Sequence, residues 1–186
     1  MVANWSQETY IKAYRFASEA HLGQLFPGTD LPYMIHVSFV CMEVMAALIV
    51  QKEMDGDLAI QCALLHDVIE DTKKCFEDIE ESFGMQVATG VKALTKNKNM
   101  EKEKQLADSL IRIREQPYEI WMVKLADRIS NLQPPPADWT KEEIRKYHAD
   151  AREIHEALKD SNAYLAARLE EKITNYAGYF NRGTDG

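Results

Sequence analysis

The chain has 186 residues, of which 46% are hydrophobic and 28% charged, and its formal net charge is −8. These values are typical of a globular protein that is long enough to bury a core. The net negative charge argues against nucleic acid as a partner, because nucleic-acid binding needs a basic surface.

Neither the N-terminus nor the apolar runs give a targeting or membrane signal. The first residues, MVANWSQETY, lack the pattern of a signal peptide. The longest apolar run, residues 39–50, is too short to span a membrane and contains Glu43. Cys41 and Cys62 lie in apolar runs and are expected to be buried thiols, which fits a reducing compartment. We therefore expect a cytoplasmic protein without a membrane partner.

The first half of the chain predicts a series of helices, because apolar residues recur at helical spacing. Ser6 is expected to cap a helix that runs to about Ala20. After a loop, a second helix is expected over about 33–53. Asp57 is expected to cap a third helix, which continues to residue 71.

The second half predicts helices as well. A short helix is expected within residues 72–83, a second over about 85–94 and a third that ends near residue 115. A further helix is expected from Pro117 to before Pro134, another after a capping box at Thr140 and Glu143, and a last one over about 162–179. There is no alternating strand pattern, no repeat and no long linker. The sequence therefore predicts an all-α fold, with one helical domain over residues 1–186 and no synthetase domain beside it.

An unusual polar cluster interrupts the apolar third helix: His66 and Asp67 are followed by Glu70 and Asp71. In a continuous helix Asp67, Glu70 and Asp71 occupy positions i, i+3 and i+4 and share one side. The C-terminal end of a helix carries partial negative charge, so each carboxylate there is unfavourable by about 0.3–1 kcal/mol. A metal ion is the simplest positive group to offset them.

Four residues from three predicted helices are candidate metal ligands: His36, His66, Asp67 and Asp127. Imidazole and carboxylate ligands together suit divalent first-row metals such as Mn, Fe or Zn. Taken singly, His36 is equally compatible with a core histidine, and Asp127 with a surface acid. The pair His66 and Asp67 is more specific, because a buried aspartate must be paired or bound to a metal.

The predicted helix that carries Asp127 adds a polar stripe, since Lys124, Asp127 and Asn131 recur on one side of it. A solvated helix face is the ordinary explanation for such a stripe. However, Lys124 and Asn131 flank a candidate metal ligand, and a lysine beside a metal suits a phosphate group. The stripe therefore indicates a site for a phosphorylated small molecule.

These residues lie in motifs that resemble a known family. The matching stretches are PYMIH (32–36), ALLHDVIEDT (63–72), FG (83–84) and VKLADRISN (123–131). Together they resemble the H…HD…D signature of HD-domain metal-dependent phosphohydrolases. More narrowly, they are similar to the hydrolase domain of RelA/SpoT homologues and, by size, to the small alarmone hydrolases.

The resemblance implies a reaction and a role for each matched residue. The family reaction removes the 3′-pyrophosphate of (p)ppGpp and gives GDP or GTP plus pyrophosphate. His36, His66, Asp67 and Asp127 match the family's metal ligands, usually for manganese. The other matched positions are Glu70 and Asp71 for positioning and activating water, Lys124 and Asn131 for the nucleotide and its phosphates, and Tyr33 and Tyr147 on the substrate side.

One position departs from the family pattern. Family members often carry an Arg-Lys pair in the loop before PYxxH, and the arginine packs on the purine. Here Phe26-Pro27 stands in its place, and no basic residue lies between His21 and His36. A phenylalanine stacks on a purine without adding charge or hydrogen bonds. We hypothesise that Phe26 is the base platform and that base selectivity is relaxed, so that (p)ppApp is also a substrate. The alternative is that Phe26 only packs its loop.

Other functions remain open at the level of sequence. A broader HD nucleotide phosphohydrolase, acting on a nucleoside phosphate or (d)NTP, would use the same metal ligands. A non-enzymatic HD regulatory module usually lacks some of them, and here all are present. Neutralisation of a nucleotide-synthesising toxin would use the same hydrolysis. The sequence also leaves a homo-oligomer open.

Overall fold

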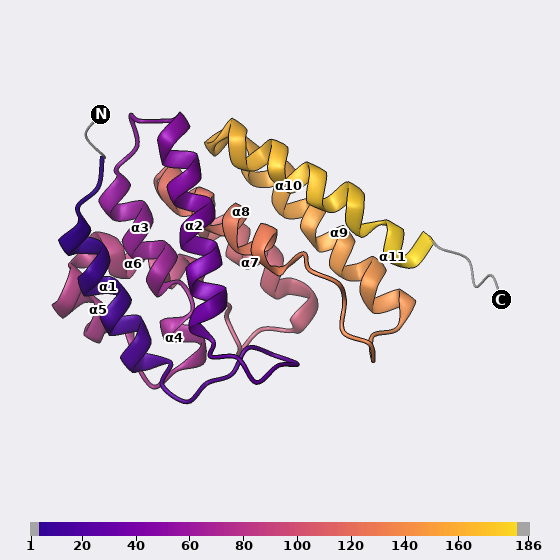
Figure 1. Cartoon of the computed structure of the whole chain (residues 1–186), viewed down its shortest axis with the longest axis horizontal. Coiled ribbons are helices and arrows are strands. Elements are labelled where there is room, and N and C mark those ends of the chain that lie inside the picture. The colour runs from indigo at the N-terminus through magenta and orange to yellow at the C-terminus, as the bar shows by residue number, and fades with distance from the viewer. Residues whose placement is uncertain (1–3, 182–186) are drawn as a thin grey trace.

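The computed structural model describes residues 4–181, and regular structure within them is helical apart from one isolated bridge between Leu25 and Pro32 (Figure 1). The predicted all-α fold is confirmed. The elements are α1 (Gln7–Ala20), α2 (Met34–Val50), α3 (Gly56–Leu65), α4 (Val68–Asp71), α5 (Phe76–Phe83), α6 (Met85–Leu94), α7 (Lys102–Arg114), α8 (Tyr118–Asn131), α9 (Lys141–Leu158), the 3-10 helix η1 (Lys159–Ser161), α10 (Ala163–Tyr176) and α11 (Gly178–Asn181).

The core is built around α2, α3 and α8. Helix α2 packs against both α3 and α8, and α3 also contacts α1, α6 and α8. Val40, Leu64 and Leu125 are fully buried between these helices. Helices α9, α10 and α11 lie together at the C-terminal side, where α9 and α10 pack on α8 (Figure 1). This arrangement brings together the helices that carry the three HD-type motifs.

Most of the predicted helix starts are confirmed. The Ser6 side chain caps α1, and Thr140 and Glu143 form a complete capping box at α9. The prediction for α3 was wrong by two residues, because its N-cap is Asp55, whose side chain accepts a hydrogen bond from the Leu58 N–H at 3.0 Å. Asp57 lies in the first turn and instead accepts a hydrogen bond from the backbone N–H of Ser6 at 2.7 Å.

The expected continuous helix up to residue 71 was also wrong, because the chain turns at His66 and Asp67 between α3 and α4. The His66 ring gives a physical reason. Its Nδ1–H donates to the Ala63 carbonyl at 2.8 Å, and in a continuous helix that carbonyl accepts from the N–H of Asp67. The side chain competes with the backbone for one acceptor, as polar side chains do near helix ends.

Smaller differences concern helix ends. Helix α2 ends at Val50 rather than near residue 53, and the last expected helix is divided into α10 and α11. Cys41 and Cys62 are buried as expected, and burial raises the pKa of the Cys41 thiol to about 12. None of the helices within residues 4–181 is long and apolar enough to cross a membrane.

Candidate metal centre and substrate site

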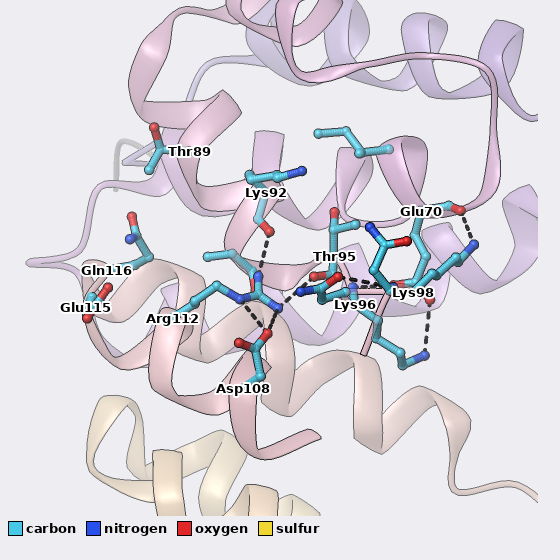
Figure 2. Close-up of a pocket in the computed structure, with 14 residues that line it drawn as sticks. Glu70, Thr89, Lys92, Thr95, Lys96, Lys98, Asp108, Arg112, Glu115 and Gln116 are labelled. Atoms are coloured by element: carbon cyan, nitrogen blue, oxygen red, sulfur yellow. Dashed lines mark hydrogen bonds and ion pairs between the residues drawn. The ribbon is translucent and has the colours of Figure 1, made fainter. Parts of the chain in front are cut away.

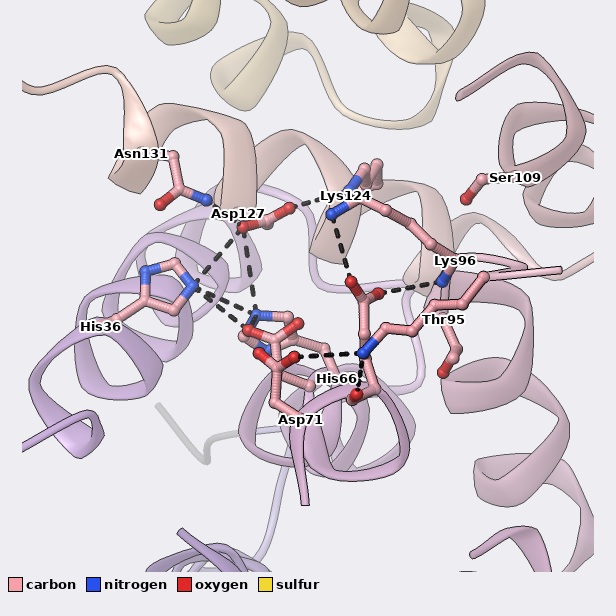
Figure 3. Close-up of polar contacts among 12 residues, drawn as sticks. His36, His66, Asp71, Thr95, Lys96, Ser109, Lys124, Asp127 and Asn131 are labelled. Atoms are coloured by element: carbon pink, nitrogen blue, oxygen red, sulfur yellow. Dashed lines mark hydrogen bonds and ion pairs between the residues drawn. The ribbon is translucent and has the colours of Figure 1, made fainter. Parts of the chain in front are cut away.

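Three segments that are distant in the sequence meet at one point. His36 comes from the first turn of α2, His66 and Asp67 from the turn between α3 and α4, and Asp127 from the C-terminal half of α8. Figure 3 shows His36, His66 and Asp127 pointing toward one another. The two histidines are buried, with 2% and 3% of their surface exposed. The structure therefore brings together all four predicted metal ligands.

The donor atoms are spaced as ligands of a single ion. His36 Nε2 lies 3.3 Å from His66 Nε2, 3.6 Å from Asp67 Oδ2 and 3.5 Å from Asp127 Oδ1. His66 Nε2 lies 2.8 Å from Asp67 Oδ2 and 4.0 Å from Asp127 Oδ1. Two ligands at about 2.1 Å from one ion, in tetrahedral or octahedral geometry, are about 3.0–3.4 Å apart. The observed separations, from 2.8 to 4.0 Å, scatter around this range. The donor atoms of His36, His66 and Asp67 lie within 4.8 Å of one another and form a group that could hold a divalent metal, with Asp127 beside it.

The outer nitrogen of each imidazole is already occupied, which orients its inner nitrogen toward the other donors. His66 Nδ1–H donates to the Ala63 carbonyl at 2.8 Å, and His36 Nδ1 shares a hydrogen bond with Ser130 Oγ at 3.3 Å. Metal-binding histidines commonly have such a partner, which fixes the tautomer and leaves the Nε2 lone pair for the ion. Ser130 was not predicted from the sequence, where its only signal is its place three residues after Asp127 on α8.

Electrostatic coupling among the four side chains is strong. Burial lowers the pKa of His36, but the hydrogen bonds and charges of Asp127 and Asp67 outweigh burial and raise that pKa to about 9. Burial raises the pKa of Asp67, yet His66 and His36 hold it well below its usual value. Without a metal, protons on the imidazoles therefore balance the two carboxylates, and a divalent ion would take their place.

The metal-side carboxylates have further partners. Asp127 accepts hydrogen bonds from Lys124 Nζ at 2.9 Å and from Asn131 Nδ2 at 2.5 Å. The Tyr33 hydroxyl donates to Asp67 Oδ2. The predicted polar stripe on α8 is thus turned inward, with Lys124 itself buried. Lys124, Asn131 and Tyr33 therefore contact candidate metal ligands in addition to the substrate contact that the sequence predicts for them.

Glu70 and Asp71 lie beside the metal-binding group, at the end of α4. The Glu70 carboxylate accepts from the backbone N–H of Lys96 at 2.9 Å and from its ammonium at 3.2 Å. Asp71 Oδ1 lies 3.8 Å from Lys98 Nζ. Burial, together with the charges of Asp67 and Glu70, raises the pKa of Asp71. The segment after α6 therefore supplies the positive charge opposite these carboxylates.

A cavity of about 160 Å³ opens onto this group. Most of the predicted site residues line it, namely Tyr33, His66, Asp67, Glu70, Asp71, Lys124, Asp127, Asn131 and Tyr147. Arg128 lines it too, with its guanidinium 4.3 Å from the Tyr147 ring centre. Its Nε and Nη1 atoms are buried and have no hydrogen-bond acceptor among the described residues. Buried donors without an acceptor are costly, so this wall fits an anionic ligand.

Phe26 is not among the residues that line this cavity. Its half-buried ring is nearly parallel to the His36 ring, at 16° and with 6.0 Å between ring centres. The surrounding loop is held by hydrogen bonds from Phe26 N–H to the Leu31 carbonyl at 2.8 Å and from Tyr33 N–H to the Gln24 carbonyl at 2.9 Å. Phe26 thus sits against a candidate metal ligand.

The fold and this donor set correspond to one family. A family model described as HD domain matches residues 13–169, which is most of the chain. The chain belongs to the HD-domain family.

Characterised relatives align along most of this length. The chain is 29% identical over 175 residues to the guanosine-3′,5′-bis(diphosphate) 3′-pyrophosphohydrolase MESH1 of Drosophila melanogaster, covering 91% of this chain and 96% of that protein. It is 34% identical over 128 residues to the bifunctional (p)ppGpp synthase/hydrolase SpoT of Escherichia coli, which covers 66% of this chain but 17% of SpoT.

Two solved structures share the fold. A metazoan orthologue of SpoT, described as hydrolysing ppGpp, superposes with a TM-score of 0.79 and 28% identity, over 94% of this chain and 98% of that one. A protein of Listeria monocytogenes superposes with a TM-score of 0.62 over 82% of this chain. At 22% identity, the second likeness concerns the fold alone.

Proposed function

We propose that this chain is a metal-dependent hydrolase that removes the 3′-pyrophosphate of ppGpp or pppGpp, with GDP or GTP and pyrophosphate as products. The observation that carries the proposal is the convergence of His36, His66, Asp67 and Asp127 beside Glu70 and Asp71. The pyrophosphohydrolase relatives, which align over nearly the whole chain, support this substrate class. A nucleotide is accordingly the small-molecule partner.

The four donors would hold one divalent ion, and we propose manganese above other ions. Such an ion, when bound, would lower the pKa of a coordinated water and polarise a phosphoryl oxygen. The chain contributes the geometry: Ser130 and the Ala63 carbonyl fix the two imidazoles, while Lys124 and Asn131 hold the Asp127 carboxylate. Fixed ligands keep the reacting groups aligned without reorganisation during the reaction.

Glu70 and Asp71 are the proposed positioning and proton-accepting groups for the attacking water. Both line the same small cavity as His66, Asp67 and Asp127, so a water between them and the scissile phosphorus is within reach of either carboxylate. Arg128, with its unpaired buried N–H groups, would receive phosphate oxygens at the opposite wall. Tyr147, which stacks on Arg128, would contact the substrate on that side.

Phe26 favours an adenine nucleotide as a second substrate. In the family pattern an arginine contacts the purine at this position, and here an uncharged ring takes its place next to His36. An aromatic platform stacks on either purine and offers no hydrogen bond with which to select guanine. We therefore include (p)ppApp with (p)ppGpp.

We also propose that the chain forms a single hydrolase domain and is located in the cytoplasm. The helices that supply the site run from α2 to α9, and packing continues through α10. This supports one hydrolase domain over residues 1–186, of which 1–3 and 182–186 lie outside the described residues. The buried thiols of Cys41 and Cys62 support the proposed cytoplasmic location.

The decisive experiment is incubation of the purified chain with Mn²⁺ and, separately, with ppGpp, pppGpp, ppApp and ordinary nucleoside triphosphates. Release of pyrophosphate from the 3′-substituted nucleotides alone is the expected result. Release of orthophosphate, or equal turnover of ordinary nucleotides, would instead identify a broader nucleotide phosphohydrolase. An Asp67→Ala variant serves as the control for contaminating activity.

A further inference from the structure

A second and wider cavity, of about 560 Å³, lies next to the candidate metal site (Figure 2). The two cavities share Glu70 and Lys96. The walls of the second one come from α4, α6, α7 and the segment 95–99 between α6 and α7. Small-molecule sites typically measure roughly 300–1,000 Å³. The cavity at the metal donors is below that range, whereas this one lies within it.

The lining is suited to an anion. Its basic residues are Lys92, Lys96, Lys98 and Arg112, against the acids Glu70, Asp108 and Glu115. The lining is therefore slightly basic in a chain whose net charge is −8. Side chains that can donate hydrogen bonds, Thr89, Asn97, Asn99 and Gln116 among them, complete the wall.

Arg112 makes this wall rigid. Its guanidinium contacts Asp108 Oδ2 at 2.8 and 2.9 Å and donates to the carbonyls of Lys92, Ala93 and Thr95 at 2.8–2.9 Å. These bonds cap the end of α6 and fix the start of segment 95–99. Lys92 differs from Arg112: its ammonium forms no hydrogen bond or ion pair with a described residue, and its side chain is exposed.

Two lysines that line this cavity, Lys96 and Lys98, also contact the proposed water-activating pair Glu70 and Asp71. Lys96 Nζ donates to Glu70 Oε1 at 3.2 Å, whereas Lys98 Nζ donates to the backbone carbonyl of Glu70 at 2.5 Å and lies 3.8 Å from Asp71 Oδ1. Both lysine side chains are more than half exposed. Glu70 and Asp71 are themselves only 12% and 33% exposed, but the two ammonium groups are open to solvent, so a ligand with several negative charges can approach and compete for them by charge attraction.

We propose that this cavity binds a polyphosphate, inorganic or carried by a nucleotide, through Lys92, Lys96 and Lys98. Binding draws the ammonium groups of Lys96 and Lys98 away from the two carboxylates and frees Glu70 Oε1 to accept a proton from the attacking water. This consequence for catalysis rests on the proposed function. The ligand is either the 5′-phosphates of the substrate itself or a separate polyphosphate such as the released pyrophosphate.

Binding is tested on the full chain by calorimetric titration with inorganic triphosphate in the absence of divalent metal. Lys92→Glu is expected to weaken the affinity about tenfold, because one favourable charge contact becomes repulsive. Lys141→Glu, the same change at an exposed lysine at the start of α9, is expected to leave the affinity unchanged. Equal affinities of wild type and Lys92→Glu, with both variants folded by circular dichroism, would overturn the proposal.

Kinetics identify the source of the phosphates. If they belong to the substrate, Lys92→Glu raises KM for ppGpp but not for guanosine 3′-diphosphate, which lacks the 5′-phosphates. If they belong to a separate ligand, added triphosphate changes the wild-type rate on both substrates and has no effect on Lys92→Glu. If neither kinetic pattern is observed, the proposed coupling of this cavity to Glu70 is refuted. The titration involves no turnover, so it stays readable even if the chain hydrolyses none of these nucleotides.

Discussion

Lys96 holds Glu70 with two different groups, a backbone N–H on Oε2 at 2.9 Å and a side-chain ammonium on Oε1 at 3.2 Å. The position of the Glu70 carboxylate therefore depends on the segment after α6 as well as on α4, the helix in which Glu70 lies. Glu70 forms no hydrogen bond or ion pair with the four candidate metal donors in the part of the chain that the structure describes. Its proposed role is therefore separable from metal binding by mutation.

Glu70→Gln preserves the shape of the side chain and the contact with the Lys96 N–H but removes the proton-accepting carboxylate. We expect kcat to fall by about 10²–10⁴, the usual contribution of a general base, with metal affinity unchanged. Asp67→Ala should abolish both, because it removes a donor. Steady-state rates and metal titration of the two variants provide the measurement, and full activity of Glu70→Gln would exclude its role in water activation.

Metal binding should depend on pH because of His36. In the metal-free protein the neighbouring carboxylates outweigh burial and raise its pKa from 6.5 to about 9, so an ion must displace a proton at neutral pH. The apparent metal affinity should therefore increase as pH rises toward 9. The metal-free fold shows the opposite trend: stability from the protonated imidazole is fully present below 6.5 and is lost as pH rises through 9.

Calorimetry at several pH values, in two buffers of different ionisation enthalpy, measures both the affinity and the number of protons released. Melting temperatures of the metal-free protein over the same range test the stability trend. An affinity that stays constant between neutral pH and pH 9 would contradict the proton displacement.

Phe26 is expected to contact the purine base of the substrate and not its phosphates. Phe26→Ala should raise KM for ppGpp and ppApp alike by about tenfold, since stacking of a base on an aromatic ring contributes about 1–3 kcal/mol. Phe26→Arg should shift the ratio of kcat/KM toward ppGpp. Leu25→Ala, at an exposed neighbouring position, is the matched control. Unchanged KM values in Phe26→Ala would assign the ring to loop packing.

The sequence predicted these candidate metal donors from local motifs: His66 and Asp67 are adjacent, and Asp127 lies with Lys124 and Asn131 at helical spacing. It did not predict the turn at Asp67. A periodic apolar pattern continues across that position, and the competing hydrogen bond from His66 to Ala63 becomes visible only with the side-chain rotamer. A local pattern predicts which residues share one side of a helix. It does not predict which hydrogen-bond partner each side chain has.

The sequence likewise did not predict the contacts that Lys96 and Ser130 make with distant residues. Lys96 meets Glu70 across 26 positions, and Ser130 meets His36 across 94. Neither residue stands out by type, since lysine and serine are ordinary surface residues. Lys124 was predicted as a phosphate contact from its type; it lines the cavity, and its ammonium also donates to Asp127, a partner that its type does not indicate.

Arg128 is expected to bind phosphate oxygens in the substrate complex. Arg128→Met should raise KM for ppGpp and the inhibition constant of pyrophosphate by about 10–100-fold, as expected for a lost charged hydrogen-bond donor worth about 1.5–3 kcal/mol. Two of its nitrogen atoms have no acceptor among the described residues, and methionine keeps an apolar side chain beside Tyr147, so the same change should lower the melting temperature little. Arg145→Met, at an exposed arginine on α9, is the control. A destabilised Arg128→Met variant with unchanged KM would assign Arg128 a structural role.

Gly90 provides a test of the packing that supports the site. A Cβ atom at this position of α6 would lie 2.6 Å from Ile120 Cδ1 and 3.0 Å from Cys62 Sγ, and both of these side chains are buried. Replacing glycine by alanine within a helix normally stabilises by about 0.5–1 kcal/mol. Here the overpacking should reverse the sign, and we expect Gly90→Ala to lower the free energy of unfolding by about 1–3 kcal/mol in urea titrations. Ile120→Val in the same chain should restore part of the loss, while Gly178→Ala, where a Cβ meets nothing within 4 Å, should cause none. A Gly90→Ala variant as stable as wild type would mean that α6 can move away from α8 without cost.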